Sequence, residues 1–149
     1  MIISANLTEL RQLFSAPDTF IAKAVEVGRT FNYSGWNIDF EPDGSIEPTN
    51  RDAVAYTGFL TKLANSLHSA NLQLTVDYDE WSPIWNLTLL AKTPVDFFMA
   101  MGTYNYEWKY FQERLDHGIT AFGTKRLVVG LETTHPGQFA RLRRNVTRC

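Results

Sequence analysis

Hydrophobic and polar positions alternate with two different periods along the chain, and each change of period marks an expected element. A period of two over residues 35–41 predicts a buried strand, because successive side chains in a strand point to opposite faces. One face would carry Trp36, Ile38 and Phe40. The other would carry Asn37, Asp39 and Glu41. A helical period over residues 51–69 predicts an amphipathic helix, with apolar positions at Tyr56, Phe59, Leu60, Leu63 and Leu67.

The same reasoning predicts further elements on both sides of this pair. Residues 1–6 have the character of the end of a strand, and a loop then leads to an N-cap at Ser15 and a helix that ends at Val27, before Gly28. Downstream, strands are predicted at residues 72–78, 96–103 and 126–132. Helices are predicted at residues 87–91, at residues 108–117 with Gly118 as the cap, and at residues 139–144.

Strands that alternate with helices in this way indicate repeated βαβ units and a parallel sheet, so the predicted fold class is α/β. A doubly wound sheet and part of a barrel both fit the number of units. The 149 residues and a 44% hydrophobic content suit one domain with a core. We therefore predict a single domain over residues 1–149, in which residues 133–149 form a tail of separate character.

Charge argues against several classes of partner. The net charge of −2 leaves no basic surface for nucleic acid or an anionic membrane, apart from arginines close to the end of the chain. No apolar run approaches the length that spans a membrane, and the first six residues are too short for a secretion signal. Asn-x-Ser/Thr sequences hint at the secretory pathway; they begin at Asn6, Asn32, Asn86 and Asn145.

Chemistry concentrates on the polar face of the strand at residues 35–41. Burial of polar groups is costly unless they are paired, so such a face is either hydrogen-bonded core or an active site. Two carboxyl groups at the end of a strand favour an active site. Because Asp39 and Glu41 would repel each other when both are ionised, one of them should keep its proton above the usual pKa.

The sequence from Ser34 to Glu41 resembles the D-G-x-D-x-D-x-E strand of glycoside hydrolase family 18, which contains chitinases and di-N-acetylchitobiase-like enzymes. Asp39 and Glu41 match two of its four acidic positions, whereas Ser34 and Asn37 stand where the family has Asp. Residues 72–76, 99–105 and 127–131 resemble the family's fifth, sixth and seventh strands. At the sixth strand, Tyr104 follows Met101 by three residues and Asn105 replaces an Asp, which departs from the family's M-x-Y-D pattern.

This resemblance implies a partial (β/α)8 TIM barrel that runs from the end of strand three to the helix after strand seven. It also implies hydrolysis of chitin-like oligosaccharides of N-acetylglucosamine by a substrate-assisted, retaining route without a cofactor or metal. Glu41 would be the general acid/base and Asp39 would orient the N-acetyl group. Tyr104 would hydrogen-bond the N-acetyl carbonyl, and Asn37 would support Asp39. Further substrate contacts would come from Trp81, Asn105 and Glu132.

The partner implied by the resemblance is therefore a carbohydrate, with no specific protein partner, and the full-length protein would be secreted or lysosomal. Two other interpretations stay open. Asp39, Glu41, Asp77 and Asp79 could together bind Mg²⁺ or Mn²⁺. Alternatively, the chain could bind sugars without catalysis, because Ser34 and Asn37 depart from the family's pattern. A partial barrel would also expose unpaired strand edges, which predicts poor stability of the chain alone.

Overall fold

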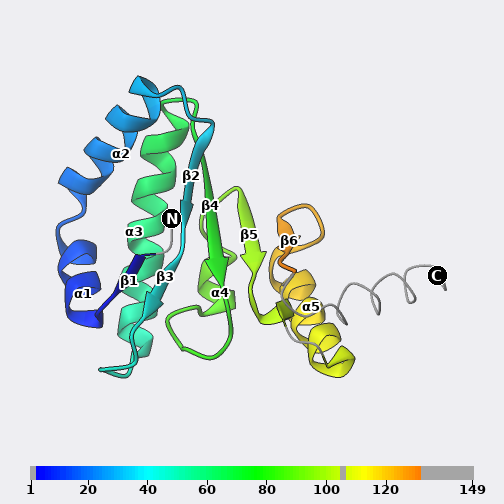
Figure 1. The fold of residues 1–149 in the computed structure, drawn as a ribbon. Coiled ribbons are helices and arrows are strands. Elements are labelled where there is room, and N and C mark those ends of the chain that lie inside the picture. The colour runs from blue at the N-terminus through cyan, green and yellow to red at the C-terminus, as the bar shows by residue number, and fades with distance from the viewer. Residues whose placement is uncertain (1–2, 105–106, 132–149) are drawn as a thin grey trace.

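The computed structural model describes residues 3–104 and 107–131, which fold into parallel strands and helices in alternation (Figure 1). The strands are β1 (Ile3–Ala5), β2 (Gly35–Ile38), β3 (Phe40–Pro42), β4 (Gln73–Tyr78), β5 (Phe97–Ala100) and β6 (Leu127–Val129). The helices are α1 (Leu7–Ser15), α2 (Asp18–Thr30), α3 (Asn50–His68), α4 (Leu87–Leu90) and α5 (Trp108–Phe122), with a 3-10 turn, η1, at Gly102–Tyr104.

The order of the strands in space follows their order in the chain. β1 pairs with β3, and a second set of strands has the order β2-β4-β5-β6, with every pair parallel. β2 and β3 are successive segments of one extended run that is interrupted only at Asp39. A doubly wound sheet reverses its strand order at a switch point, whereas a barrel adds each new strand beside the previous one. The fold is therefore an arc of a TIM barrel, which confirms the predicted fold class.

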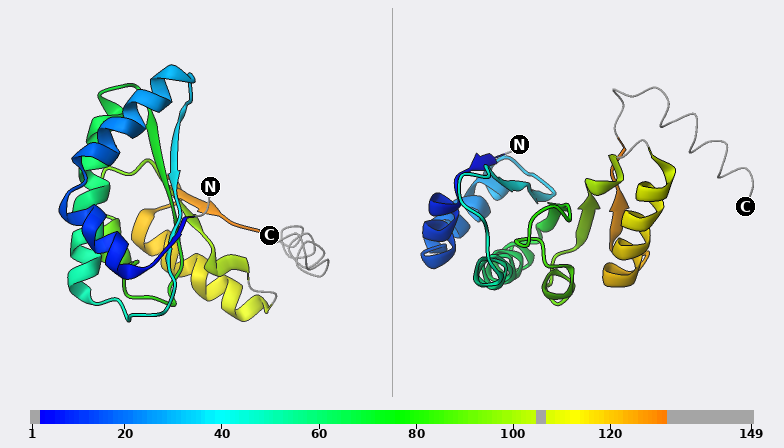
Figure 2. Two further views of the ribbon diagram at one scale, coloured as in Figure 1. Left: turned by 60° about the vertical axis from the view of Figure 1, so that its left-hand side comes forward. Right: turned by 90° about the horizontal axis from the view of Figure 1, so that it is seen from below.

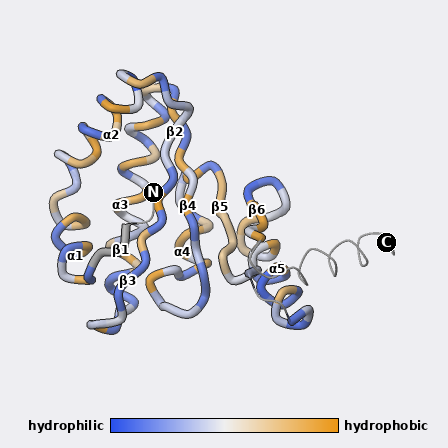
Figure 3. Tube along the Cα trace, in the orientation of Figure 1, coloured by the Kyte–Doolittle hydropathy of each residue, from blue (hydrophilic) through white to orange (hydrophobic). Residues whose placement is uncertain are grey.

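The helices cover one face of this curved sheet (Figure 2). α2 contacts β2, α3 contacts β4, and α5 contacts β5 and β6. The alternation predicted for residues 35–41 holds on this side, since Ile38 and Phe40 are buried and the indole of Trp36 donates to the carbonyl of Ala24 on α2. Apolar turns of α3 complete the core, and Figure 3 shows the alternation of hydrophobic and hydrophilic residues along that helix. The opposite face of the sheet carries the polar positions.

Two predicted boundaries were wrong because glycines were interpreted as helix ends. α2 continues through Gly28 to Thr30, and α5 continues through Gly118 to Phe122. Both glycines are close-packing positions. A Cβ on Gly28 would lie 2.6 Å from Leu72 Cδ1, and one on Gly118 would lie 2.5 Å from the hydroxyl of Tyr78. Gly123, with a φ of 70°, follows α5 as its C-cap residue.

Helix α1 was missed, since residues 7–15 were interpreted as a loop. Asn6 caps it by accepting a hydrogen bond from the backbone of Glu9, and Leu7, Leu10 and Phe14 form its buried stripe. Strand β5 is shorter than predicted and is followed by η1. The predicted helix at residues 139–144 lies outside the described residues, as does the end of the predicted last strand.

Polar anchors tie the helices to one another at defined points. Asp52, in the first turn of α3, accepts two hydrogen bonds from Arg11 of α1, at 2.7 and 3.0 Å, and two from Thr49, both at 2.8 Å. These donors hold the pKa of Asp52 well below its usual range. Arg126 donates to three backbone carbonyls before β5 and lies over the ring of Phe98. The first anchor joins α1 to the start of α3, and the second joins the start of β6 to the segment before β5.

One edge of the sheet is open among the described residues. β1 pairs with β3 only, so residues of β2 pair with β4 on one side and face a groove on the other. The groove has a volume of about 360 Å³ and lies between β2 and α2. Its walls are largely apolar, with Phe20, Ala24 and Val27 contributed by α2. The sequence predicted unpaired edges at the first and last strands, and among the described residues the four-stranded order ends at β2 on one side and at β6 on the other.

Candidate active site

The candidate site lies on the face of the sheet that the helices leave uncovered, toward the carboxyl ends of β3 and β4. Parallel pairing places Asn37 opposite Thr75 and Ile38 opposite Val76. Continuing this register by one residue brings Asp39 opposite Asp77, with Glu41 and Asp79 following on the same face. Four carboxyl groups from two neighbouring runs therefore meet at one end of the sheet, where barrel enzymes place their chemistry.

Asp39 is the most enclosed of these acids. It lies at the interruption between β2 and β3, is 5% exposed, and its Oδ1 has no hydrogen-bond partner among the described residues. Burial raises its pKa above the usual value, because desolvation disfavours the charged form. An unpaired buried carboxyl oxygen is rare in a merely structural role.

Glu41 lies two residues further on, in β3, and is partly buried. Its pKa is raised first by burial and then by the negative charges of Asp39, Asp79 and Asp77. This is the pattern predicted from the sequence, in which neighbouring acids make one carboxyl hold its proton. A carboxyl group that stays protonated toward neutral pH can act as a proton donor.

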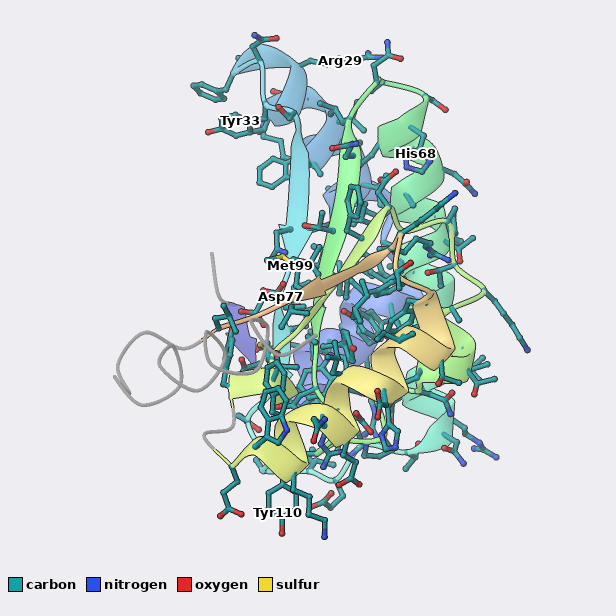
Figure 4. The ribbon with its side chains drawn as sticks, turned by 90° about the vertical axis from the view of Figure 1, so that its right-hand side faces the viewer. Arg29, Tyr33, His68, Asp77, Met99 and Tyr110 are labelled. Atoms are coloured by element: carbon teal, nitrogen blue, oxygen red, sulfur yellow. The ribbon has the colours of Figure 1, made fainter. Side chains whose placement is uncertain are left out.

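Asn37 is directed toward the neighbouring strand β4. Its Nδ2 donates to Thr75 Oγ1 at 2.9 Å and to Asp77 Oδ1 at 3.0 Å, and it lies 3.4 Å from the sulfur of Met99. The side chain was predicted to support Asp39, and the contacts instead place it against Asp77. Figure 4 shows Asp77 beside Met99, its register partner on β5.

Tyr104 reaches the same cluster from the end of η1. Burial, followed by the charges of Asp77, Asp39, Glu41 and Asp79, raises the pKa of its hydroxyl. The ring packs against Gly130, where an added Cβ would lie 2.5 Å from Tyr104 Cε1. The side chain remains 43% exposed, so its hydroxyl can meet a ligand. The predicted neighbour Asn105 lies outside the described residues, as does Glu132.

The loop after β4 contains two tryptophans with different environments. Trp85 is buried and fills the core, whereas Trp81 is 55% exposed and packs edge-on against Trp85, with ring centroids 4.8 Å apart. A rigid, exposed indole of this kind offers a face for stacking. Trp81 was the tryptophan predicted to contact substrate, and Trp85 serves as the hydrophobic plug.

The sequence interpretation undervalued Asp77 and Asp79, which it considered only as metal ligands. Their signal was present, since Thr75, Asp77 and Asp79 alternate with Leu74, Val76 and Tyr78. The pKa values of both acids are raised by burial. Among residues 3–104 and 107–131, no group of three or more His, Cys, Asp and Glu side chains has an arrangement that could hold a metal ion.

A further acid lies just behind this cluster, at the start of the same loop. Glu80 Oε2 forms an ion pair with Arg114 Nη1 at 2.8 Å and is hydrogen-bonded with His117 Nδ1 at 2.8 Å, both from α5. Gly102 makes room for this arrangement, because a Cβ there would lie 2.7 Å from Asp79 Oδ1 and 3.3 Å from the Arg114 side chain. These contacts join α5 to the segment that follows β4, and they fix the position of the loop at the rim of the site.

Solved structures with the same fold are chitinases and a spore cortex-lytic enzyme. A chitinase from Chromobacterium violaceum aligns over 81% of this chain with a TM-score of 0.68 and 18% identity. A class V chitinase from Pseudomonas fluorescens aligns over 72% with a TM-score of 0.59 and 19% identity. The spore cortex-lytic enzyme SleL from Bacillus megaterium aligns over 87% with a TM-score of 0.71 and 17% identity.

The fold is shared with these enzymes. At such identities the likeness establishes the fold alone, and the chain spans only 43%, 38% and 33% of their respective lengths. No protein family matches the sequence, and no curated protein is significantly similar to it. In the part of the chain that the structure describes, no helix is both long and apolar enough to cross a bilayer.

Proposed function

We propose that this chain carries the acid/base machinery of a glycoside hydrolase that acts on chitin-like oligosaccharides of N-acetylglucosamine. The observation that carries the proposal is Glu41. The Glu41 side chain lies toward the C-terminal ends of the strands, on the face of the sheet that the helices leave uncovered (the inner face). Its pKa is raised by burial and by three acidic neighbours. The fold it shares with chitinases supports the same assignment.

In the proposed reaction, protonated Glu41 gives its proton to the glycosidic oxygen as the bond to the anomeric carbon breaks. The carbonyl oxygen of the substrate's own N-acetyl group attacks that carbon from the opposite side. This substrate-assisted route needs no nucleophile from the protein. Ionised Glu41 then takes a proton from the water that opens the cyclic intermediate, so the two displacements return the original anomeric configuration.

The neighbouring residues have matching roles in this proposal. Ionised Asp39 would orient the N-acetyl group and stabilise the positive charge that develops on it. The hydroxyl of Tyr104, which lies among the carboxylates, would donate to the N-acetyl carbonyl. Trp81 would stack on a sugar ring at the rim, since its indole is exposed and braced by Trp85.

Turnover of a fluorogenic chitobioside tests the proposal. We expect the parent chain to release the fluorophore and Glu41→Gln to lose at least about a hundredfold in rate, the scale of general acid catalysis. Glu47→Gln is a matched control, because Glu47 is an exposed loop acid, and it should retain the parent rate. Equal rates for Glu41→Gln and the parent would refute the role of Glu41. Binding of chitooligosaccharide without turnover by either protein would favour a sugar-binding function.

A further inference from the structure

The proposed reaction assigns no role to Asp77, although the carboxyl group of this residue lies inside the site. Asp77 is partly buried on the inner face of β4. One of its oxygens, Oδ1, is held at 3.0 Å by the amide of Asn37, which also binds Thr75 at 2.9 Å. The amide nitrogen therefore fixes one oxygen of Asp77 and leaves Oδ2 free to interact elsewhere.

The neighbour that best suits this oxygen is Asp39. The β2–β4 register continued by one residue sets Asp39 directly opposite Asp77, on strands that lie about 4.8 Å apart. Asp39 Oδ1 is buried and has no hydrogen-bond partner in the described part of the chain. Two ionised carboxylates this close repel strongly, whereas one proton between them turns the repulsion into a hydrogen bond.

We propose that Asp39 and Asp77 form a carboxyl–carboxylate pair that shares one proton, and that Asp77, anchored by Asn37, is a positioning residue for Asp39. The proton resides on Asp77 Oδ2 and is donated to Asp39 Oδ1. Asp39 thereby stays ionised and oriented even though it is buried. The role of the pair in catalysis rests on the proposed function, because the N-acetyl group requires an ionised Asp39. The existence of the pair does not depend on that function.

The charges around the pair favour a bound proton. Burial raises the pKa of Asp77 and the charge of Asp39 adds to this, whereas the Asn37 hydrogen bond and the positive charge of the N-terminus lower it. The other groups that face the cluster are also acids, namely Glu41 of β3, Asp79 of β4 and Tyr104 of η1. Arg114 of α5 acts on Asp79, but it is ion-paired with Glu80. No described basic side chain forms an ion pair with Asp39 or Asp77.

Carboxyl ¹³C NMR during a pH titration of the full chain tests the pair directly. In the parent, the Asp39 resonance should respond in two steps, the upper one above the ordinary Asp pKa of about 3.9. Asp77→Asn should remove the upper step. The exchange variant Asn37→Asp/Asp77→Asn, which returns one carboxyl group to the neighbourhood of Asp39, should restore it. Asp43→Asn, which alters an exposed loop acid, should leave the Asp39 curve unchanged.

A single Asp39 step in the parent, or an identical Asp39 curve in Asp77→Asn, would overturn the proposal. Asn37→Ser provides a second test if Asp77→Asn does not fold. It keeps both acids and removes the amide donor that stabilises ionised Asp77, so the upper step should move to higher pH, and an unchanged step would also overturn the proposal. The titration uses no substrate, so an inactive chain with a two-step Asp39 curve would refute the glycosidase proposal and leave the pair intact.

Discussion

Replacement of Asn37 by aspartate would place a new carboxylate where the amide now meets Asp77 Oδ1, at 3.0 Å. The new group would add a second unit charge beside the one that the Asp39–Asp77 pair carries, and two such charges roughly 3–5 Å apart repel by about 3–5 kcal/mol at an effective dielectric constant of about 20. The protein can relieve this by holding a proton, so the pKa of the new group in the folded state must rise above its unfolded value of about 3.9. The free energy of unfolding should then fall as pH rises.

The sign of this effect follows from proton linkage. Below about pH 3.9 the new carboxyl group is protonated in both states and its charge costs nothing. Above that pH the unfolded chain releases the proton while the folded chain retains it, so stability falls by about 1.4 kcal/mol per pH unit until the raised pKa is reached. We expect a charge-dependent loss of about 2–4 kcal/mol near neutral pH relative to acid pH.

Urea unfolding followed by tryptophan fluorescence at pH 4 and pH 7.5 measures this loss. Asn37→Ser is the matched control, because it removes the same amide donor without adding a charge. Its deficit relative to the parent should be similar at the two pH values. If Asn37→Asp were no less stable than Asn37→Ser near neutral pH, the placement of Asn37 against Asp77 would be wrong.

Three further predictions address the framework and the rim of the site. Asp52→Ala should lower the free energy of unfolding by about 2–4 kcal/mol in urea titrations at pH 7, because four hydrogen bonds to a buried carboxylate are lost. A loss below about 1 kcal/mol, which removal of a helix cap alone would cause, would contradict this. Gly118→Ala should lower the melting temperature, since its Cβ would lie 2.5 Å from Tyr78, whereas Gly58→Ala on α3, with no atom within 4 Å, should raise it. Trp81→Ala should weaken chitooligosaccharide binding at least about fivefold with unchanged stability, and unchanged affinity would remove Trp81 from the site.

The fold class could be predicted because each strand has a clear pattern and each long helix a clear stripe. Strand residues 35–41 and helix residues 51–69 were located to within a residue or two. Helix α1 was missed because its residues were interpreted as a loop, and two helix ends were misplaced because of glycines. Gly28 and Gly118 have the local character of helix ends, but tertiary packing requires them because no side chain fits where the helix meets a leucine or a tyrosine. Such contacts are not visible in a single sequence.

The site was predictable along one strand and poorly predictable across strands. Alternation within residues 35–41 identified Asp39 and Glu41 as neighbours and anticipated the raised pKa of Glu41. The partner of Asn37 depends on the register of β2 with β4, which relates residues about forty positions apart. For this reason the sequence brought Asp77 together with Asp39 only in the metal-binding interpretation and gave it no role in the proposed reaction, although its own strand showed the alternation.

The central claim is that neighbouring acids keep a proton on Glu41 for transfer to the glycosidic oxygen. The pH dependence of kcat/KM on the fluorogenic chitobioside tests this most directly, in the parent and in Asp79→Asn. The alkaline limb of the parent profile should lie above the ordinary Glu pKa of 4.5, and it should move to lower pH in Asp79→Asn, because a negative neighbour that raises the pKa of Glu41 has been removed. An alkaline limb at the same pH in both proteins would contradict the account.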